Sequence, residues 1–223
     1  MQKFDTPAQV SVVLDIPAGR VRFIAADRSD TTVEVLPANP SKGRDVKAAE
    51  QVTVAHSDGV LRIGAASAKN RILGDSGSVE ITVQLPAGSR VEAKAASAEF
   101  RGVGRLGDVV VEAAHGSVKF DEAESARLTV QAGDVTVGRL GGPAEISTQK
   151  GDLRIAEAVR GTVVLRTESG SIEVGATRGV SATLDAGTGY GRVDNALKNA
   201  DGADSALHIR ATTSHGDITA RSL

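Results

Sequence analysis

Hydrophobic and polar residues alternate along the second half of the chain in a pattern that recurs about every 18 residues. Each copy reads as a glycine, then mostly Ser or Asp, then an apolar, a polar and an apolar residue. The positions seven and five residues before each glycine, and two and four after it, are mostly apolar. The repeat glycines are Gly116, Gly133, Gly151, Gly170, Gly189 and Gly216, at spacings of 17, 18, 19, 19 and 27.

A period of two residues predicts β-strands with one buried face, because successive side chains of a strand point to opposite sides. Each repeat therefore contains two short strands, too few for a core of their own, whereas stacked copies can share one. This predicts an all-β chain folded as a β-solenoid, similar to a single-stranded β-helix, with two-strand coils of about 18 residues. An irregular copy with Ala98 in the glycine place suggests that the solenoid occupies residues 86–223.

Residues 1–85 are also rich in strand patterns but lack the period, so they are expected to form an N-terminal capping region, or to continue one single domain with the solenoid. Pro and Gly predict a loop over 37–43, and one turn of helix is expected at 46–50. The alternating segments, each bounded by turn-forming residues, are 10–16, 20–24, 31–36, 51–54, 60–63 and 78–85.

Several motifs resemble a bacterial β-strand-repeat family of unknown function whose members are commonly labelled "putative adhesins". They are the opening Phe4–Pro7, Leu85–Ser89, the serial Gly-Asp/Ser units, Tyr190–Asn195 and the closing Thr213–Ile218. The resemblance covers essentially the whole chain and implies an elongated β-helical module without established catalytic residues. Ala98, where the repeat expects Gly, departs from the pattern.

Composition removes several classes of function. The chain has no Cys, which excludes disulfides, thiolate nucleophiles and Cys-ligated metals, and its net charge of −2 offers little attraction for nucleic acid. It has no run of 18 apolar residues and no apolar signal segment near its start, so no membrane insertion and a cytoplasmic location are expected. The alternative location is the cell surface, if a signal or anchor segment precedes the given sequence.

Candidate chemistry is sparse. Asp134 and Asp152 share one column, which is suited to acid–base work or a hard cation, but Ser or Asp beside Gly is typical of turns. Gly187–Gly191 lacks the Lys-Ser/Thr and the helix that a phosphate loop needs. The four His residues are too scattered for a metal site. No catalytic residue, cofactor or metal is therefore expected.

The break in the period is the most informative feature. It adds about nine residues over 194–204, and insertions in solenoids form loops that often bind partners. The candidate partner-binding residues at its start are Tyr190, Arg192, Asp194 and Asn195. The pattern favours a non-enzymatic, adhesin-like interaction module that presents an elongated face to a protein partner or to itself. The alternatives are a carbohydrate-active β-helix enzyme and a cytoplasmic scaffold polymer.

Overall fold

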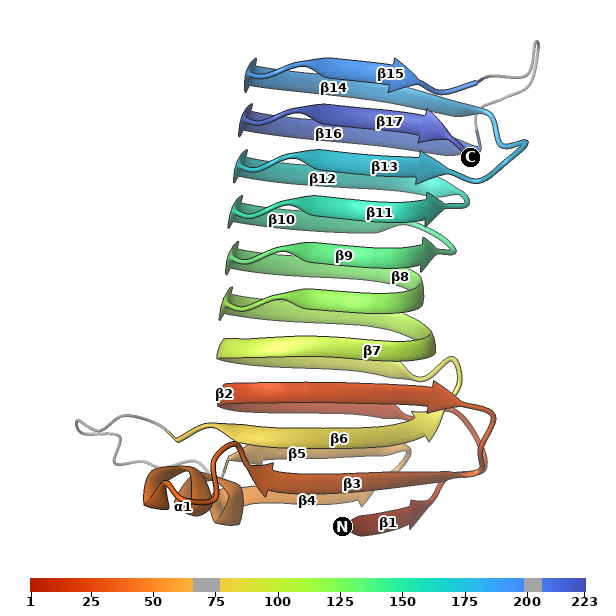
Figure 1. Cartoon of the computed structure of the whole chain (residues 1–223). Coiled ribbons are helices and arrows are strands. Elements are labelled where there is room, and N and C mark those ends of the chain that lie inside the picture. Colours follow the sequence, from red (N-terminus) through yellow and green to blue (C-terminus); the bar gives the residue numbers. More distant parts are fainter. Residues whose placement is uncertain (66–76, 199–205) are drawn as a thin grey trace. The chain divides into compact units, whose positions relative to one another are not determined.

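The computed structural model describes residues 1–65, 77–198 and 206–223. These residues form an all-β, solenoid-like fold with an open sheet and one short helix (Figure 1). The chain packs as two compact units, residues 1–116 and 117–223. The predicted division into residues 1–85 and 86–223 marks the start of the sequence repeat, which is a different criterion from compact packing. That division stays a prediction.

In unit 1, residues 1–116, the parallel stacking extends to a segment near the N-terminus. β2 pairs in parallel with β5, β6 and β7, and Gly19 lies opposite Ala98 in the register with β7. β2 is therefore stacked like a further copy of the repeat. The sequence pattern did not reveal it, because strands without the period separate it from the regular repeats. The elements of unit 1 are β1 (Gln2–Asp5), β2 (Ser11–Ala26), β3 (Asp30–Pro37), α1 (Gly43–Gln51), β4 (Val52–Ser57), β5 (Val60–Ala65), β6 (Val79–Pro86) and β7 (Arg90–His115).

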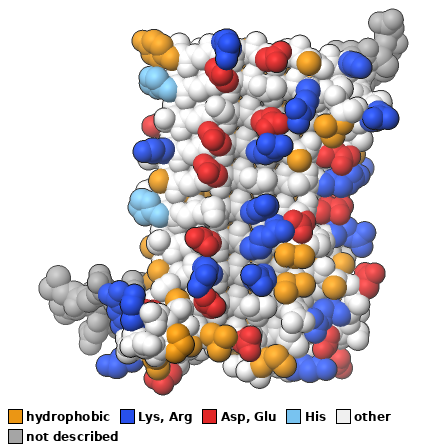
Figure 2. Space-filling model, viewed as in Figure 1, with side chains coloured by type: hydrophobic (Ala, Val, Ile, Leu, Met, Phe, Trp, Pro, Cys, Tyr) orange, Lys and Arg blue, Asp and Glu red, His pale blue; other side chains and the backbone are white. Residues whose placement is uncertain are grey.

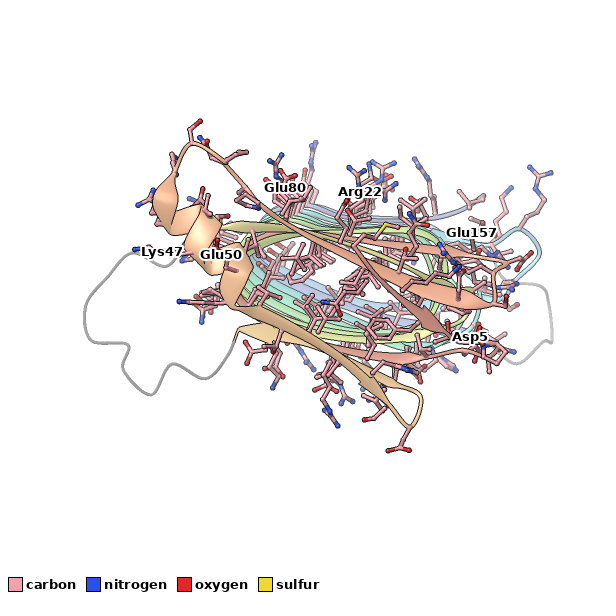
Figure 3. All side chains as sticks on the ribbon, turned by 90° about the horizontal axis from the view of Figure 1, so that it is seen from below. Asp5, Arg22, Lys47, Glu50, Glu80 and Glu157 are labelled. Atoms are coloured by element: carbon pink, nitrogen blue, oxygen red, sulfur yellow. The ribbon has the colours of Figure 1, made fainter. Side chains whose placement is uncertain are left out.

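Antiparallel strands and α1 complete unit 1. β1 pairs with β3, β3 with β6, and β4 with β5, all antiparallel. The helix expected over 46–50 is present and longer, and Lys47 and Glu50 are exposed on it (Figure 3). The buried Asp45 holds the helix in place by accepting a 3.0 Å hydrogen bond from the Ser78 N–H. Within the described ranges, no helix is long and apolar enough to cross a membrane.

Unit 2, residues 117–223, consists of two stacks of parallel strands. One stack runs from the second part of β8 through β10, β12 and β16 to β14, and the other runs from the first part of β8 through β9, β11, β13 and β17 to β15. The strands are β8 (Val118–Ala132), β9 (Val135–Leu140), β10 (Ala144–Lys150), β11 (Leu153–Ala158), β12 (Gly161–Ser169), β13 (Ile172–Ala176), β14 (Ala182–Tyr190), β15 (Val193–Ala196), β16 (Leu207–His215) and β17 (Ile218–Ser222).

The spatial order of the coils departs from their order in the sequence. The last coil, β16–β17, lies between β12–β13 and β14–β15, so β14–β15 forms the outermost coil of unit 2, which we call the edge coil (Figure 1). Tyr190 pairs with His215 and Val193 with Ile218, which places Gly191 opposite Gly216. The predicted place of Gly189 in the glycine column is therefore wrong. Spacing alone could not choose among three closely spaced glycines, whereas the positive φ of +155° marks Gly191 as the corner residue.

The predicted apolar columns form the core of unit 2. The column two residues after each glycine is at most 1% exposed at Val118, Val135, Leu153, Ile172 and Ile218. Each such side chain contributes about 1.5–3 kcal/mol through burial, so the ladder is a main source of stability. Near the corner glycines, the inward-facing positions are occupied by buried Thr side chains. The hydroxyls of Thr167 and Thr213 donate to the carbonyls of Gly151 and Gly170 at 3.1 and 3.0 Å.

Candidate functional site

The Asp column forms hydrogen bonds between coils. The Asp134 Oδ1 accepts from the Asp152 N–H at 2.9 Å, and the Asp152 Oδ1 accepts from the Ser171 N–H at 2.7 Å. The Asp217 Oδ1 accepts in the same way from the Arg192 N–H at 2.8 Å. One oxygen of each carboxylate therefore binds the corner backbone of the neighbouring coil, which is the turn role that the sequence favours for these residues.

Replacing Asp152 by Ala is expected to lower the free energy of unfolding by about 1–2 kcal/mol, because the Ser171 N–H loses a charged acceptor. Millimolar calcium is expected to leave the melting temperature of the parent protein unchanged. A micromolar site would add about 4 kcal/mol through binding to the folded state alone, which thermal unfolding would detect. A large calcium-dependent rise that disappears in Asp152→Ala would contradict this assignment.

Three of the four His residues contact a neighbouring side chain. His215 stacks on Tyr190, His208 Nδ1 lies 2.9 Å from the Thr183 hydroxyl, and the rings of His56 and Phe4 lie 5.5 Å apart. Among the described residues, no group of three or more His, Asp or Glu side chains is placed to hold a metal ion.

Two of the four candidate partner-binding residues lie at one corner, on either side of Gly191. Tyr190 is 75% exposed, and its ring is stacked on His215 with centroids 5.1 Å apart and planes inclined by 12°. The Arg192 side chain is 89% exposed, and its Nη2 lies 3.5 Å from Asp217 Oδ2. The C-terminal coil thus supports the aromatic ring by stacking and the guanidinium through an ion pair.

The other two candidates lie further along β15. Asp194 pairs in register with Thr219 on the outer side, whereas Asn195 pairs with Ala220, which belongs to a buried inner column. The Asn195 Oδ1 accepts a 3.1 Å hydrogen bond from the Leu197 N–H, which turns the chain after β15. Of the predicted insertion over 194–204, residues 199–204 lie outside the described residues.

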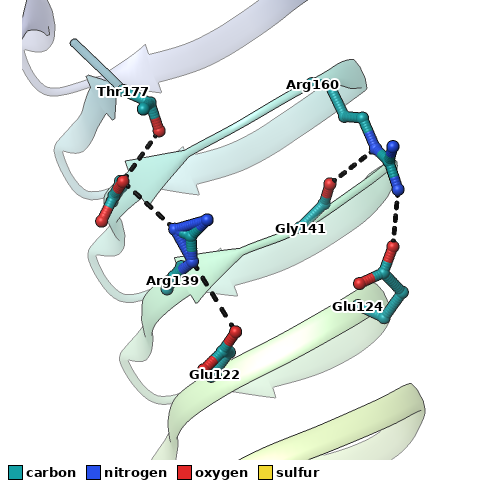
Figure 4. Close-up of polar contacts among 7 residues, drawn as sticks. Glu122, Glu124, Arg139, Gly141, Arg160 and Thr177 are labelled. Carbon is teal, nitrogen blue, oxygen red and sulfur yellow. Dashed lines mark hydrogen bonds and ion pairs between the residues drawn. The ribbon is translucent and has the colours of Figure 1, made fainter.

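Outward charges on unit 2 pair across neighbouring coils. Arg139 lies 3.6 Å from Glu122 and 3.2 Å from Glu157, while Arg160 reaches Glu124 at 2.9 Å (Figure 4). Acidic and basic side chains are interspersed over the face seen in Figure 2. Such ladders neutralise the surface locally.

Unit 1 contains an open cleft of about 560 Å³. Arg28 on its wall donates to Asp30 Oδ1 at 2.8 Å and also to Gln84, while Lys3 lies 3.1 Å from the other Asp30 oxygen. These hydrogen bonds, of which the one from Arg28 has the larger effect and the one from Lys3 the smaller, lower the pKa of Asp30 from 3.8 to about 2. This network accounts for the position of Arg28 without a ligand. The lining residues are Pro7, Ala8, Gln9, Ala26, Asp27, Arg28, Pro86, Ala87 and Arg105.

Comparison with known proteins identifies relatives of this fold. A solved structure of a "putative adhesin" from Parabacteroides distasonis ATCC 8503 is similar, with a TM-score of 0.55 and 17% identity over 98% of this chain and 95% of the other. A "putative adhesin" from Bacteroides fragilis NCTC 9343 has a TM-score of 0.48 and 14% identity, covering 98% and 95%.

A "putative lipid binding protein" from Parabacteroides distasonis ATCC 8503 has a TM-score of 0.47 and 11% identity, again covering 98% of this chain and 95% of the other. No curated protein matches the chain in sequence. The family model described as Toastrack DUF4097 matches residues 10–222, nearly the whole length. The chain therefore belongs to the Toastrack DUF4097 family, a family of unknown function.

Proposed function

We propose that the chain is a non-enzymatic, adhesin-like interaction module that binds a protein partner through the corner of the edge coil. The main supporting observation is the exposed Tyr190 ring, stacked on His215 beside the exposed guanidinium of Arg192. Tyr and Arg are the residue types most enriched in binding hot spots, and an ordered ring loses little conformational freedom on binding. Asp194 and Asn195 extend the candidate surface along β15.

The coil length, the first residue of the solenoid and the N-terminal cap are also part of this proposal. Two-strand coils of about 18 residues from residue 86 onward, with a strand-rich cap before them, would display an elongated polar face. The register within unit 2 supports the coil length, because Ala126 pairs with Ala144 and Ala144 pairs with Val163.

The rival function, a carbohydrate-active β-helix enzyme, needs carboxylates and basic residues gathered at one unpaired site. The cross-coil ion pairs favour the binding role, since Glu173 is shared between Arg154 at 2.9 Å and Arg221 at 3.0 Å. Incubation with acidic polysaccharides is expected to yield no unsaturated products. Their appearance, with loss of activity in Glu173→Gln, would favour the enzyme.

The expected partner is a protein, with neither nucleic acid nor membrane insertion involved. The expected location is the cytoplasm, whereas an adhesin-like role would place the binding surface outside the cell. Fractionation of host cells followed by immunodetection separates these two locations.

A Tyr190→Ala/Arg192→Ala double variant is expected to lose at least about tenfold in affinity for the protein partner, since two hot-spot side chains are removed. The measurement is cross-linking and capture from native host extract, followed by titration of the captured protein. The matched control is Arg127→Ala/Thr129→Ala on the exposed outer side of β8, which is expected to bind like the parent. Equal binding by a folded double variant would refute the proposed surface.

A further inference from the structure

The edge coil has a second surface that differs from the corner around Tyr190. β14 pairs with β16 and β15 with β17, and in the parts of the chain that the structure describes neither β15 nor residues 183–190 of β14 pair with a strand on the other side. A strand edge with unpaired N–H and C=O groups is a template for pairing with another strand.

Inner side chains are also uncovered at this end. Val193 is 45% exposed, although Ile218, with which it pairs, is only 1% exposed. Leu184 and Ala186 are only half-buried, whereas Ile209, the residue paired with Leu184, is 1% exposed. The same columns that form the core elsewhere in unit 2 therefore reach the surface at the edge coil.

We propose that this end face, formed by Leu184, Ala186, Val193 and the outer strand edges of residues 183–190 and of β15, docks on the end face of a second copy. A two-fold axis perpendicular to the strands sets the two β14 strands antiparallel. The contact would continue the strand stack at a spacing of about 4.8 Å and cover the inner columns of both copies. It goes beyond the proposed function, because it uses a different surface of the same coil.

The charge pattern of the edge strands fits pairing with themselves. Asp185 is the only charged residue of β14. Antiparallel pairing centred on Ala186 sets Asp185 opposite Gly187 of the second copy, so the two carboxylates do not face each other. In β15, antiparallel pairing centred on Asn195 keeps the same faces together and sets Asp194 opposite Ala196 of the second copy. Like charges directly opposite would destabilise the pair, and this arrangement avoids them.

Symmetry and size set the kind of assembly. An isologous contact uses the same surface on both copies, so it closes as a dimer and does not grow into a filament. A strand of nine residues is about 30 Å long, and two stacks about 10 Å apart give an end face on the order of 300 Å² per copy. Stable interfaces bury about 800 Å² per partner, so the dimer should be weak, with a dissociation constant in the micromolar range or above.

The absence of Cys from the chain allows a direct test. Ala186→Cys would place the only thiol of each copy next to the two-fold axis, and mild oxidation is expected to produce a disulfide-linked dimer. Thr129→Cys, exposed on the outer side of β8, is the matched control and is expected to form no disulfide-linked dimer. Sedimentation equilibrium of the parent is expected to show a reversible monomer–dimer equilibrium.

A pair of lysine variants in β14 tests whether the inward-facing positions, and not the outward-facing ones, form the contact between the two copies. Ala186→Lys would trap an ammonium group between two copies, so the dissociation constant is expected to rise at least about tenfold. Gly187→Lys adds the same charge on the same strand, and a Cβ at Gly187 meets no atom within 4 Å. This second variant is expected to dimerise at least as well as the parent, because its ammonium group would lie opposite Asp185 of the second copy.

The outcomes distinguish this inference from the proposed function. A parent protein that stays monomeric to about 1 mM, forms filaments, or cross-links equally through Thr129→Cys overturns the end-face dimer. Occupation of the β14 edge by a strand of another protein, with no dimer, overturns it as well. The Tyr190→Ala/Arg192→Ala variant should still dimerise, so loss of partner binding with dimerisation intact, or the reverse, identifies which proposal has failed.

Discussion

Gly170→Ala is expected to lower the free energy of unfolding by about 3 kcal/mol or more, measured by denaturant titration. Gly170 has φ +152°, and an added Cβ would lie 2.0 Å from the Gly151 carbonyl oxygen of the adjacent coil. That oxygen belongs to the backbone and already accepts the Thr167 hydroxyl, so it cannot move without disturbing the stack. The control is Gly187→Ala, which adds a methyl group in open space and should change stability by no more than about 0.5 kcal/mol.

Equal losses in the two glycine variants would show that the corner glycines do not limit the approach of neighbouring coils. A loss confined to Gly170→Ala would instead tie the recurrence of glycine in the sequence to the backbone contact between coils.

Val135→Asp is expected to destabilise the protein by about 4 kcal/mol or more, because it places an unpaired carboxylate in the inner ladder, where Val135 is 1% exposed. Thr136→Asp changes the next residue, whose side chain points to the outer side and is partly exposed, and should change stability by about 0.5 kcal/mol. Thermal or denaturant unfolding compares the two variants. Similar melting temperatures would mean that the inner and outer columns have been assigned to the wrong faces.

The columns of unit 2 could be predicted because strand alternation and the corner glycine recur together in every coil. The strand patterns at 10–16 and 20–24, which correspond to β2, were expected, but β2 and Gly19 could not be recognised as a copy of the repeat, because the neighbouring copy around Ala98 lies far along the chain and lacks the glycine. A period detects neighbours in sequence, whereas β2 and β7 are neighbours only in space.

The sequence predicted some residues of the candidate site but not the residues that contact them. Tyr190 stands out as the only Tyr of the chain, and Arg192 lies two residues after it, beside a break in the period. Their partners His215 and Asp217 carried the repeat signal, but their sequence positions gave no sign that they adjoin Tyr190 and Arg192. The sequence order of the coils suggested β12–β13 as the neighbour of β14–β15, and only the three-dimensional pairing identified the C-terminal coil.

The position of the last coil also affects how the chain can fold during its synthesis. β14 and β15 leave the ribosome before β16 and β17, yet the strands with which they pair are the later ones. Until Leu207–Ser222 emerges, β14 cannot form its native pairing, and β12 is exposed on the side that β16 will occupy. Non-local pairings of this kind form slowly and leave partly folded chains open to wrong contacts, such as direct docking of β14 on β12. The emergence of β16–β17 therefore completes its interfaces with β12–β13 and with β14–β15 at the same time. Until then, the nascent chain must keep β12–β13 and β14–β15 from pairing with each other.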